Sequence, residues 1–262
     1  MLRTILAALL ALALPSLAAA DETVGARVEY WSMDLTGDIA VSGSASTTLG
    51  TDTLSLEEST DGLGLDNESP VGASAWLNLG PFFAFGRYTP IDISGRGSTT
   101  QEVAFGDVTF DVNATLDSSL QFNMYDLGVG IHLLNFDDLP VRIQVGLLGQ
   151  VKLLDGNVEV TGTEAGTGAT ATESQDFTLP IPMVGGRLKL GLADFLAVEV
   201  RGAAIGYSGD HLYDAEARVE LSPIPFVGVS GGYRIIDLAV DQSDVNLNAT
   251  FDGPFVEAFI RF

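Results

Sequence analysis

Apolar and polar residues alternate along most of the chain, as they do in strands with one apolar face. Ten segments show this pattern: 23–33, 70–79, 82–93, 120–133, 140–154, 178–190, 195–207, 211–222, 226–237 and 254–262. Pro180 and Pro182 cannot donate ladder hydrogen bonds, so we expect the outer end of the sixth strand to be bent or unpaired. After residue 20 no apolar run approaches the ~20 residues of a membrane-spanning helix. The pattern therefore predicts an all-β chain.

The connections between these strands alternate in length. Those at 80–81, 135–139, 192–194 and 222–225 are short, whereas 34–69, 94–119, 155–177 and 238–250 are long and polar, and the one near Gly209 is short. Short turns at one end and long loops at the other are typical of transmembrane β-barrels. We therefore predict an antiparallel transmembrane β-barrel of about 10 strands, with both termini in the periplasm. A soluble β-sandwich would not explain the alternation of connection lengths.

The strand number has two alternatives, 8 and 12. Residues 101–112 alternate around Gly106-Asp107 and predict a hairpin that projects beyond the membrane. A barrel with 12 strands would result if this hairpin crossed the membrane instead.

The two ends of the chain predict export. Residues 1–20 have a basic start at Arg3, an apolar run and a small-residue site before Asp21, which predicts a cleaved signal peptide followed by a barrel of residues 21–262. In the last strand, one face carries Val256, Ala258, Ile260 and Phe262. A final apolar face ending on Phe resembles the C-terminal signal of bacterial outer-membrane barrels. We therefore expect outer-membrane lipid, lipopolysaccharide and the barrel-assembly machinery as partners.

The basic residues indicate which face of each strand points into the barrel. Of the 11 basic residues after the signal peptide, only Arg96 lies in a predicted loop, and the others lie opposite the apolar face. A basic residue on the lipid face at mid-depth would cost roughly 2–4 kcal/mol. The predicted lumen-facing charges are Arg27, Glu29, Arg87, Arg142, Lys152, Arg187, Lys189, Glu199, Arg201, Arg218, Arg234, Glu257 and Arg261.

These charges predict a filled lumen. A barrel of about ten strands is narrow enough for side chains to fill, and buried charges need partners. Asp126, Glu216 and Glu220 are further candidate partners on the same faces. We expect a cross-linked polar plug, and the alternative is a small conduit lined by Arg and Lys.

Aromatic residues sort by strand end. All six tyrosines fall toward the predicted extracellular ends, and all but Tyr207 have lipid-facing parity. Phe82, Phe195, Phe226 and Phe262 fall at the periplasmic turns or terminus. This sorting predicts aromatic girdles at two membrane interfaces.

The charge balance limits the possible partners. The formal net charge is −23, which argues against nucleic acid. Residues 34–68 carry eight carboxylates and residues 155–176 carry five, without Lys or Arg. Divalent cations could bridge these acidic loops to lipopolysaccharide phosphates, although their spacing matches no known calcium loop. With no Cys and no metal-ligand cluster, we expect no metal site and no cofactor.

Catalytic candidates are few. Of the two histidines, His132 lies near a periplasmic turn, and His211 follows Asp210 near Ser208 and Asp214 at the predicted extracellular rim. An acid beside a histidine can position a general base, but neighbouring residues on a strand point to opposite faces. We therefore assign no catalytic residues and expect no enzyme. A surface protease of the omptin kind or a lipid A-modifying enzyme is the alternative.

Four short motifs carry a family resemblance: residues 63–68 (LGLDNE), 105–110 (FGDVTF), 212–214 (LYD) and 251–254 (FDGP). With them the chain resembles an uncharacterised family of Gram-negative outer-membrane β-barrel proteins of about this length. The resemblance implies a porin-like membrane barrel in the outer membrane and names no functional residue. Taken together, the sequence predicts a structural or surface-binding barrel, with a small-solute channel as the alternative function.

Overall fold

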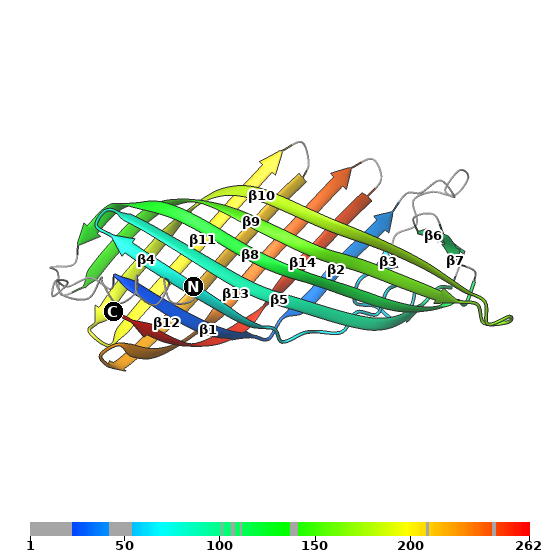
Figure 1. Ribbon diagram of the computed structural model, residues 1–262, viewed down its shortest axis with the longest axis horizontal. Helices are drawn as coiled ribbons and strands as arrows, with labels where there is room; N and C mark the ends of the chain where they lie inside the picture. Colours follow the sequence, from blue (N-terminus) through cyan, green and yellow to red (C-terminus); the bar gives the residue numbers. More distant parts are fainter. Residues whose placement is uncertain are drawn as a thin grey trace, which may run out of the picture.

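The wall of the protein is a closed ring of ten antiparallel strands (Figure 1). The computed structural model describes residues 23–41, 54–100, 102–105, 108–110, 112–136, 141–207, 210–242 and 245–262. Around the ring lie β1 (Val24–Trp31), β4 (Val71–Leu79), β5 (Phe82–Ser98), β8 (Thr115–Phe136), β9 (Arg142–Thr163), β10 (Thr170–Ala193), β11 (Leu196–Tyr207), β12 (Asp210–Ile224), β13 (Val227–Gln242) and β14 (Val245–Arg261). The predicted fold, an all-β antiparallel barrel of ten strands, is confirmed.

The last strand closes the ring. β14 pairs with β13 on one side and with β1 on the other, and Glu29 lies opposite Glu257. Val256, Ala258, Ile260 and Phe262 point outward, as the C-terminal pattern predicts. Both termini of the described chain lie at one end of the barrel, which we call the terminal end (Figure 1). The opposite end is the loop end.

Four short strands lie outside the ring. β2 (Asp34–Val41) continues the line of β1 and pairs with the outer part of β14, and β3 (Leu54–Ser55) pairs with β2. β6 (Val103–Phe105) and β7 (Val108–Phe110) form a separate hairpin at the loop end (Figure 1). The hairpin therefore does not cross the wall, and the ring keeps ten strands. The predicted signal peptide and the hairpin tip at Gly106-Asp107 lie outside the described residues.

Gly253 lies where β14 changes its neighbour from β1 to β2. Its φ is +155°, and a Cβ at this position would stand 1.9 Å from the backbone oxygen of Ser32. Its carbonyl accepts a hydrogen bond of 3.2 Å from the Trp31 indole. The strands approach too closely here for any side chain, which explains the glycine of the 251–254 motif.

Apolar side chains form a band around the outside of the terminal half. Val28, Leu127 and Val184 are 57%, 63% and 75% exposed, although each lies within a strand of the ring. Tyr30, Tyr88, Tyr213 and Tyr233 are exposed at the edge toward the loop end, and Phe82, Phe195, Phe226 and Phe262 are exposed at the terminal end. Aromatic girdles on both sides of an apolar band are typical of a barrel that faces lipid.

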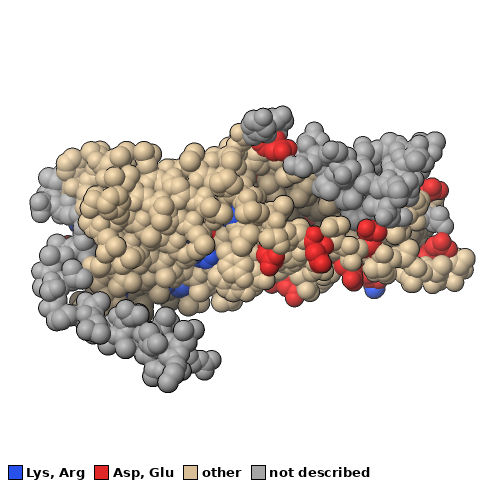
Figure 2. All heavy atoms as spheres, turned by 45° about the horizontal axis from the view of Figure 1, so that its top comes forward, with Lys and Arg blue, Asp and Glu red and all other residues tan. Residues whose placement is uncertain are grey.

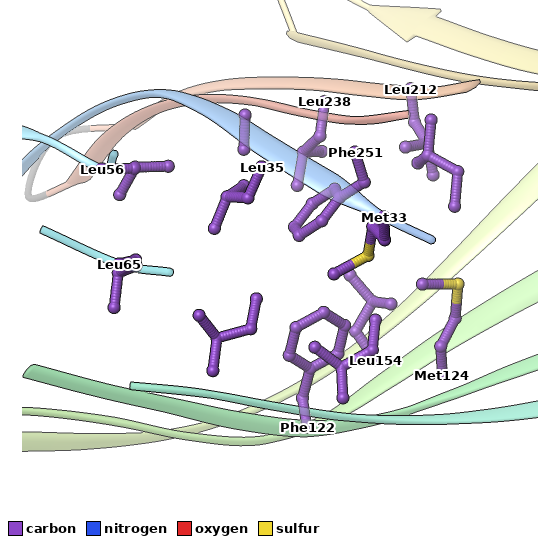
Figure 3. Close-up of a cluster of buried hydrophobic side chains, with 14 of the residues drawn as sticks. Met33, Leu35, Leu56, Leu65, Phe122, Met124, Leu154, Leu212, Leu238 and Phe251 are labelled. Carbon is purple, nitrogen blue, oxygen red and sulfur yellow. The ribbon is translucent and has the colours of Figure 1, made fainter. Parts of the chain in front are cut away.

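The pattern of inward and outward residues reverses beyond the tyrosines. Toward the loop end the interior is apolar, and Leu35, Leu116 and Phe122 are buried there. Figure 3 shows such side chains from opposite walls meeting inside the barrel. The outward residues of the same strands are polar, as at Asp34 and Asp155, and Figure 2 shows acidic side chains gathered on this half. The loop end therefore resembles a water-soluble β-barrel continued from a lipid-facing one.

Segment 54–70 covers the interior between β2 and β5. Leu54, Leu56, Leu63 and Leu65 are buried in it, and Leu65 bridges to β5. Asp61 accepts hydrogen bonds of 2.6 Å from the Thr100 backbone N–H and 2.5 Å from its hydroxyl. These hydrogen bonds lower the pKa of the Asp61 carboxyl. The hydrogen bonds between Asp61 and Thr100 are therefore present at neutral pH and are lost as pH falls through that lowered pKa.

The long polar loops predicted from the sequence are wrong in extent. β5 runs to Ser98, β8 starts at Thr115, and β9 and β10 pair from Thr163 and Thr170 onward. Residues 245–250 are paired as well. The error has a physical cause, because strands outside the membrane carry polar outward residues and so lose the apolar alternation that marks a lipid-facing strand.

The proline prediction is right for one edge of β10 only. Pro180 and Pro182 are paired with Leu153 and Val151 of β9. On the other side, the ladder to β11 stops at Val184 and Ala204. A strand with one free edge tolerates prolines, whose missing N–H removes a ladder hydrogen bond.

Among the described residues, no helix has the length and hydropathy to span a membrane.

We predict that the apolar interior of the loop end stabilises the fold. Leu116→Ala, at a fully buried position, should lower the free energy of unfolding by about 2–5 kcal/mol. Glu159→Ala, outward on the neighbouring strand β9, should change it by less than about 0.5 kcal/mol. Urea unfolding of the refolded protein in detergent micelles measures both values. Equal, small effects would mean that this interior is not a packed core.

Candidate functional site

Charged side chains fill the interior between the terminal end and the apolar core. The structure buries Arg27, Glu29, Arg87, Lys152, Glu199, Arg218, Arg234 and Glu257. It places Arg142, Arg187, Lys189, Arg201 and Arg261 half-buried around the luminal hollows. Together with Asp126, Asp214, Glu216 and Glu220, these residues form three groups, which we call outer, central and inner, from the loop end to the terminal end.

The outer group has two carboxylates and two cations. Lys152 pairs with Asp126, and its Nζ lies 2.8 Å from Asp214 Oδ2. Arg234 Nη2 lies 2.8 Å from Asp126 Oδ2 and 2.9 Å from Asp214 Oδ2. Lys152 Nζ also contacts the Met124 sulfur at 3.2 Å, and the Arg234 guanidinium lies 5.2 Å from the Trp31 ring centre. This group therefore joins the charged lumen to the apolar core.

The central group has three carboxylates and three cations. Glu216 pairs with Arg87 at 2.6 Å, with Arg201 at 2.9 Å and with Arg218. Arg218 also donates two hydrogen bonds, of 3.0 and 3.1 Å, to Glu257. Glu29 lies 3.9 Å from Arg87. The group links β1, β5, β11, β12 and β14 across the lumen.

The inner group has more cations than carboxylates. Glu199 accepts hydrogen bonds of 2.7 and 3.0 Å from Arg187, while Glu220 pairs with Arg27 and lies 2.9 Å from Lys189. Arg142 and Arg261 line the mouth at the terminal end. Arg142 Nη2 donates to the Ala193 carbonyl at 3.2 Å. The Arg27 guanidinium lies 4.4 Å from the Trp76 ring centre, a cation–π contact.

Two hollows lie among the described residues of the lumen. One, of about 30 Å³, is lined by residues that include Trp76, Phe85 and Arg201. The other, of about 50 Å³, opens at the terminal end and is lined by residues that include Arg142, Lys189 and Arg261. Each water needs roughly 10–15 Å³ of such space. The hollows therefore have room for a few waters each.

Asp214 of the outer group is missing from the lumen-facing charges that the sequence predicts. The sequence suggests Asp214 only as a rim neighbour of His211, whereas in the structure it binds Lys152 and Arg234. The alternation along the strand does indicate that Asp214 faces the lumen, because Asp214, Glu216 and Arg218 alternate with exposed Tyr213 and Ala217.

The carboxylate partner of His211 lies on the neighbouring strand β13. His211 Nε2 lies 2.7 Å from Asp237 Oδ1, and Thr250 donates to Asp237 Oδ2 at 3.0 Å. Ser208 lies outside the described residues. His132 lies at the luminal mouth, with its ring 4.9 Å from that of Phe83. Across the described ranges, His, Asp and Glu form no group that could hold a metal ion.

A shallow hollow of about 540 Å³ lies on the outside, just beyond the tyrosines of β5 and β8. Apart from Pro90, its outward side chains are polar: Asp92, Gln121, Asn123, Asp155, Asn157, Asp176 and Thr178. Gln121 donates to Asp92 at 3.0 Å, and Thr178 donates to Asp155 at 2.6 Å. The hollow is the part of the acidic exterior closest to the apolar band on these strands.

We predict that the outer group depends on its cations. Arg234→Met leaves two buried carboxylates with Lys152 alone and should destabilise the fold by about 3–5 kcal/mol. Arg96→Met, which removes an exposed ion pair with Asp117, should have no measurable effect. Adding Asp214→Asn to Arg234→Met should restore part of the lost free energy of unfolding, because it removes the carboxylate that Arg234→Met leaves unpaired. Denaturant unfolding tests this ordering, and a fully stable Arg234→Met would contradict it.

Comparisons with known proteins give distant structural likenesses. No family model and no curated protein matches the chain. The attachment invasion locus protein Ail of Yersinia pestis is similar at 9% identity and a TM-score of 0.33, covering 90% of this chain and 99% of that one. The Pseudomonas putida toluene transporter TodX has 7% identity and a TM-score of 0.31, covering 93% and 91%. A Pseudomonas aeruginosa FadL homologue has 10% identity and a TM-score of 0.26, covering 92% and 91%.

Proposed function

We propose that the protein is an integral outer-membrane β-barrel with a plugged lumen and a structural or surface-binding role. Its apolar band would lie in the hydrocarbon region, with the terminal end in the periplasm and the loop end outside the cell. The tyrosines at one edge of the band and the phenylalanines at the other support this placement.

The observation that carries the proposal is the filled interior. Salt bridges link opposite walls in the outer and central groups, as between Arg234 and Asp126, and between Arg87 and Glu216. In the inner group Arg27 of β1 reaches Glu220 of β12 past the two strands between them. Above them, apolar residues such as Met33, Phe122 and Phe251 pack across the loop end (Figure 3). Separating these ion pairs inside a low-dielectric interior would leave buried charges unpaired, which costs several kcal/mol. The ion pairs therefore support a stable plug better than an open conduit.

The plug predicts an electrically silent protein. The refolded mature chain in planar bilayers should give no steady single-channel conductance. A multiple variant, Arg87→Ala with Glu216→Ala and Arg218→Ala, should give measurable current if it folds, because it removes the linked side chains of the central group. A heat-modifiable shift on gels checks folding. Steady ion conductance in the unaltered protein would favour the alternative, a small-solute channel.

The acidic exterior supports the surface-binding part. The outer hollow carries Asp92, Asp155 and Asp176 next to the tyrosine girdle, where lipopolysaccharide sugars and phosphates would lie. Carboxylates repel phosphates directly, but Ca²⁺ or Mg²⁺ can take oxygen ligands from both. We propose that divalent cations bridge this surface to lipopolysaccharide. The barrel-assembly machinery remains the expected partner for the C-terminal strand.

Cation bridging predicts that lipopolysaccharide association depends on divalent ions. Lipopolysaccharide should stay with the purified protein in Mg²⁺ and be released by EDTA. Asp92→Asn with Asp155→Asn and Asp176→Asn should reduce this retention, whereas Asp38→Asn, an exposed acid on β2, should not. Retention that is unchanged by EDTA and by the triple variant would contradict the bridging.

We propose no enzymatic role for the rim histidine. The contact of His211 with Asp237 and the stacking of its ring 4.8 Å from Tyr213 fit a packing role between β12 and β13. An unchanged lipid A profile and unchanged peptide cleavage in His211→Ala cells would agree with this, and loss of either activity would favour the enzyme alternative.

A further inference from the structure

Glu29 is an acid of the central group whose two side-chain oxygens accept no hydrogen bond from the part of the chain that the structure describes. The residue is only 3% exposed, and water can reach almost none of the surface of either oxygen. The other two acids of the group differ. Glu216 pairs with three arginines, and Glu257 accepts hydrogen bonds from Arg218 and Ser230. Glu29 therefore lacks the hydrogen bonds that an ionised carboxylate needs at a buried position.

The cations near Glu29 are bound to other acids. Arg87 Nη2 lies 3.9 Å from Glu29 Oε2, which is too far for a hydrogen bond, and the same nitrogen lies 2.6 Å from Glu216 Oε2. Arg234 also faces Glu29, from β13, and it binds both carboxylates of the outer group. Arg27, two residues before Glu29 on β1, pairs with an acid of the inner group. Each of these cations is therefore held by an acid other than Glu29.

Two other acids face Glu29. Glu257 lies directly opposite it in the register of β1 against β14, and Glu216 faces it from β12. Like charges that lie directly opposite each other destabilise a pair of strands. On the other side of β1, Gly72 of β4 lies opposite Glu29 and has no side chain, and β4 carries no charged residue. A negative charge on Glu29 would therefore stand beside the charge of Glu257 without compensation from β4.

We propose that Glu29 holds a proton at neutral pH, which makes it a buried proton-binding site at the seam between β1 and β14. A carboxylate without hydrogen bonds, in a place that water does not reach, is so unfavourable that the group takes up a proton instead. The neutral carboxyl removes the repulsion with Glu257 and leaves Arg87 to Glu216. In the unfolded chain Glu29 meets water and is ionised at neutral pH. Closure of the ring therefore takes up one proton from water, and unfolding releases it.

The pH dependence of unfolding tests the site with Glu29→Gln, because glutamine is a neutral side chain of the same shape. Urea unfolding of both refolded proteins in detergent micelles, between about pH 6 and pH 8, gives their unfolding equilibrium constants. The ratio of the constant of the unaltered protein to that of the variant should rise about tenfold per pH unit while folded Glu29 keeps its proton. Glu159→Gln, at an exposed acid of β9, should leave the corresponding ratio constant. A ratio for Glu29→Gln that does not change with pH would overturn the proposal.

Infrared spectroscopy tests the same proton without unfolding the protein. At neutral pH the unaltered protein in lipid should show the carbonyl stretch of a protonated carboxylic acid, and Glu29→Gln should remove this band. Should Glu29→Gln fail to fold, Glu29→Met, which is neutral and unbranched, takes its place. Absence of the band in the unaltered protein, or its persistence in the variant, would overturn the proposal. The lumen can be closed whether Glu29 is protonated or paired with Arg87, so the proposal can fail while the proposed function stands.

Discussion

Ion pairing across the lumen is the constraint on which the terminal half of the barrel depends. A basic side chain cannot face lipid at mid-depth without a cost of roughly 2–4 kcal/mol, and it cannot face a dry interior without a partner. The wall meets both conditions by placing cations and carboxylates inward at matching depths. Glu216, with three arginines around it, shows the result, because Arg87, Arg201 and Arg218 come from three different strands. Such pairs specify register as well as charge.

The reversal of polarity along the barrel axis follows from a change of solvent. Inside the membrane the outer surface must be apolar, so the interior receives the polar groups. Beyond the tyrosines the outer surface meets water, and the interior becomes an ordinary apolar core. Trp31 and Met124 stand at the boundary, where Arg234 and Lys152 contact them. One set of strands therefore supports two kinds of interior, one charged and one apolar.

The sequence predicts the membrane-facing half of the fold well, because period-2 alternation and charge parity both depend on lipid. The ten strands, the outward Val256 and the inward Arg142 all follow from it. It predicts the loop end poorly, since Asp155 to Thr163 looks like a loop when its outward residues are polar, although it is strand. The sequence also does not predict which luminal residues form ion pairs with one another. Parity places Asp214 inward, but the sequence does not give the register of β12 against β13 that brings it to Arg234, or the closure of the ring that brings it to Lys152 of β9 across the lumen.

We propose that the interior is filled by paired charges with little water. Hydrogen exchange at the Arg234 side-chain Nε–H, followed by NMR of the protein in lipid nanodiscs, tests it most directly. Arg234 is fully buried, and its Nε donates toward Asp214 at 3.3 Å. A filled lumen predicts that this hydrogen exchanges far more slowly than that of exposed Arg96. Equal exchange rates at the two arginines would mean a water-filled lumen and would contradict the account.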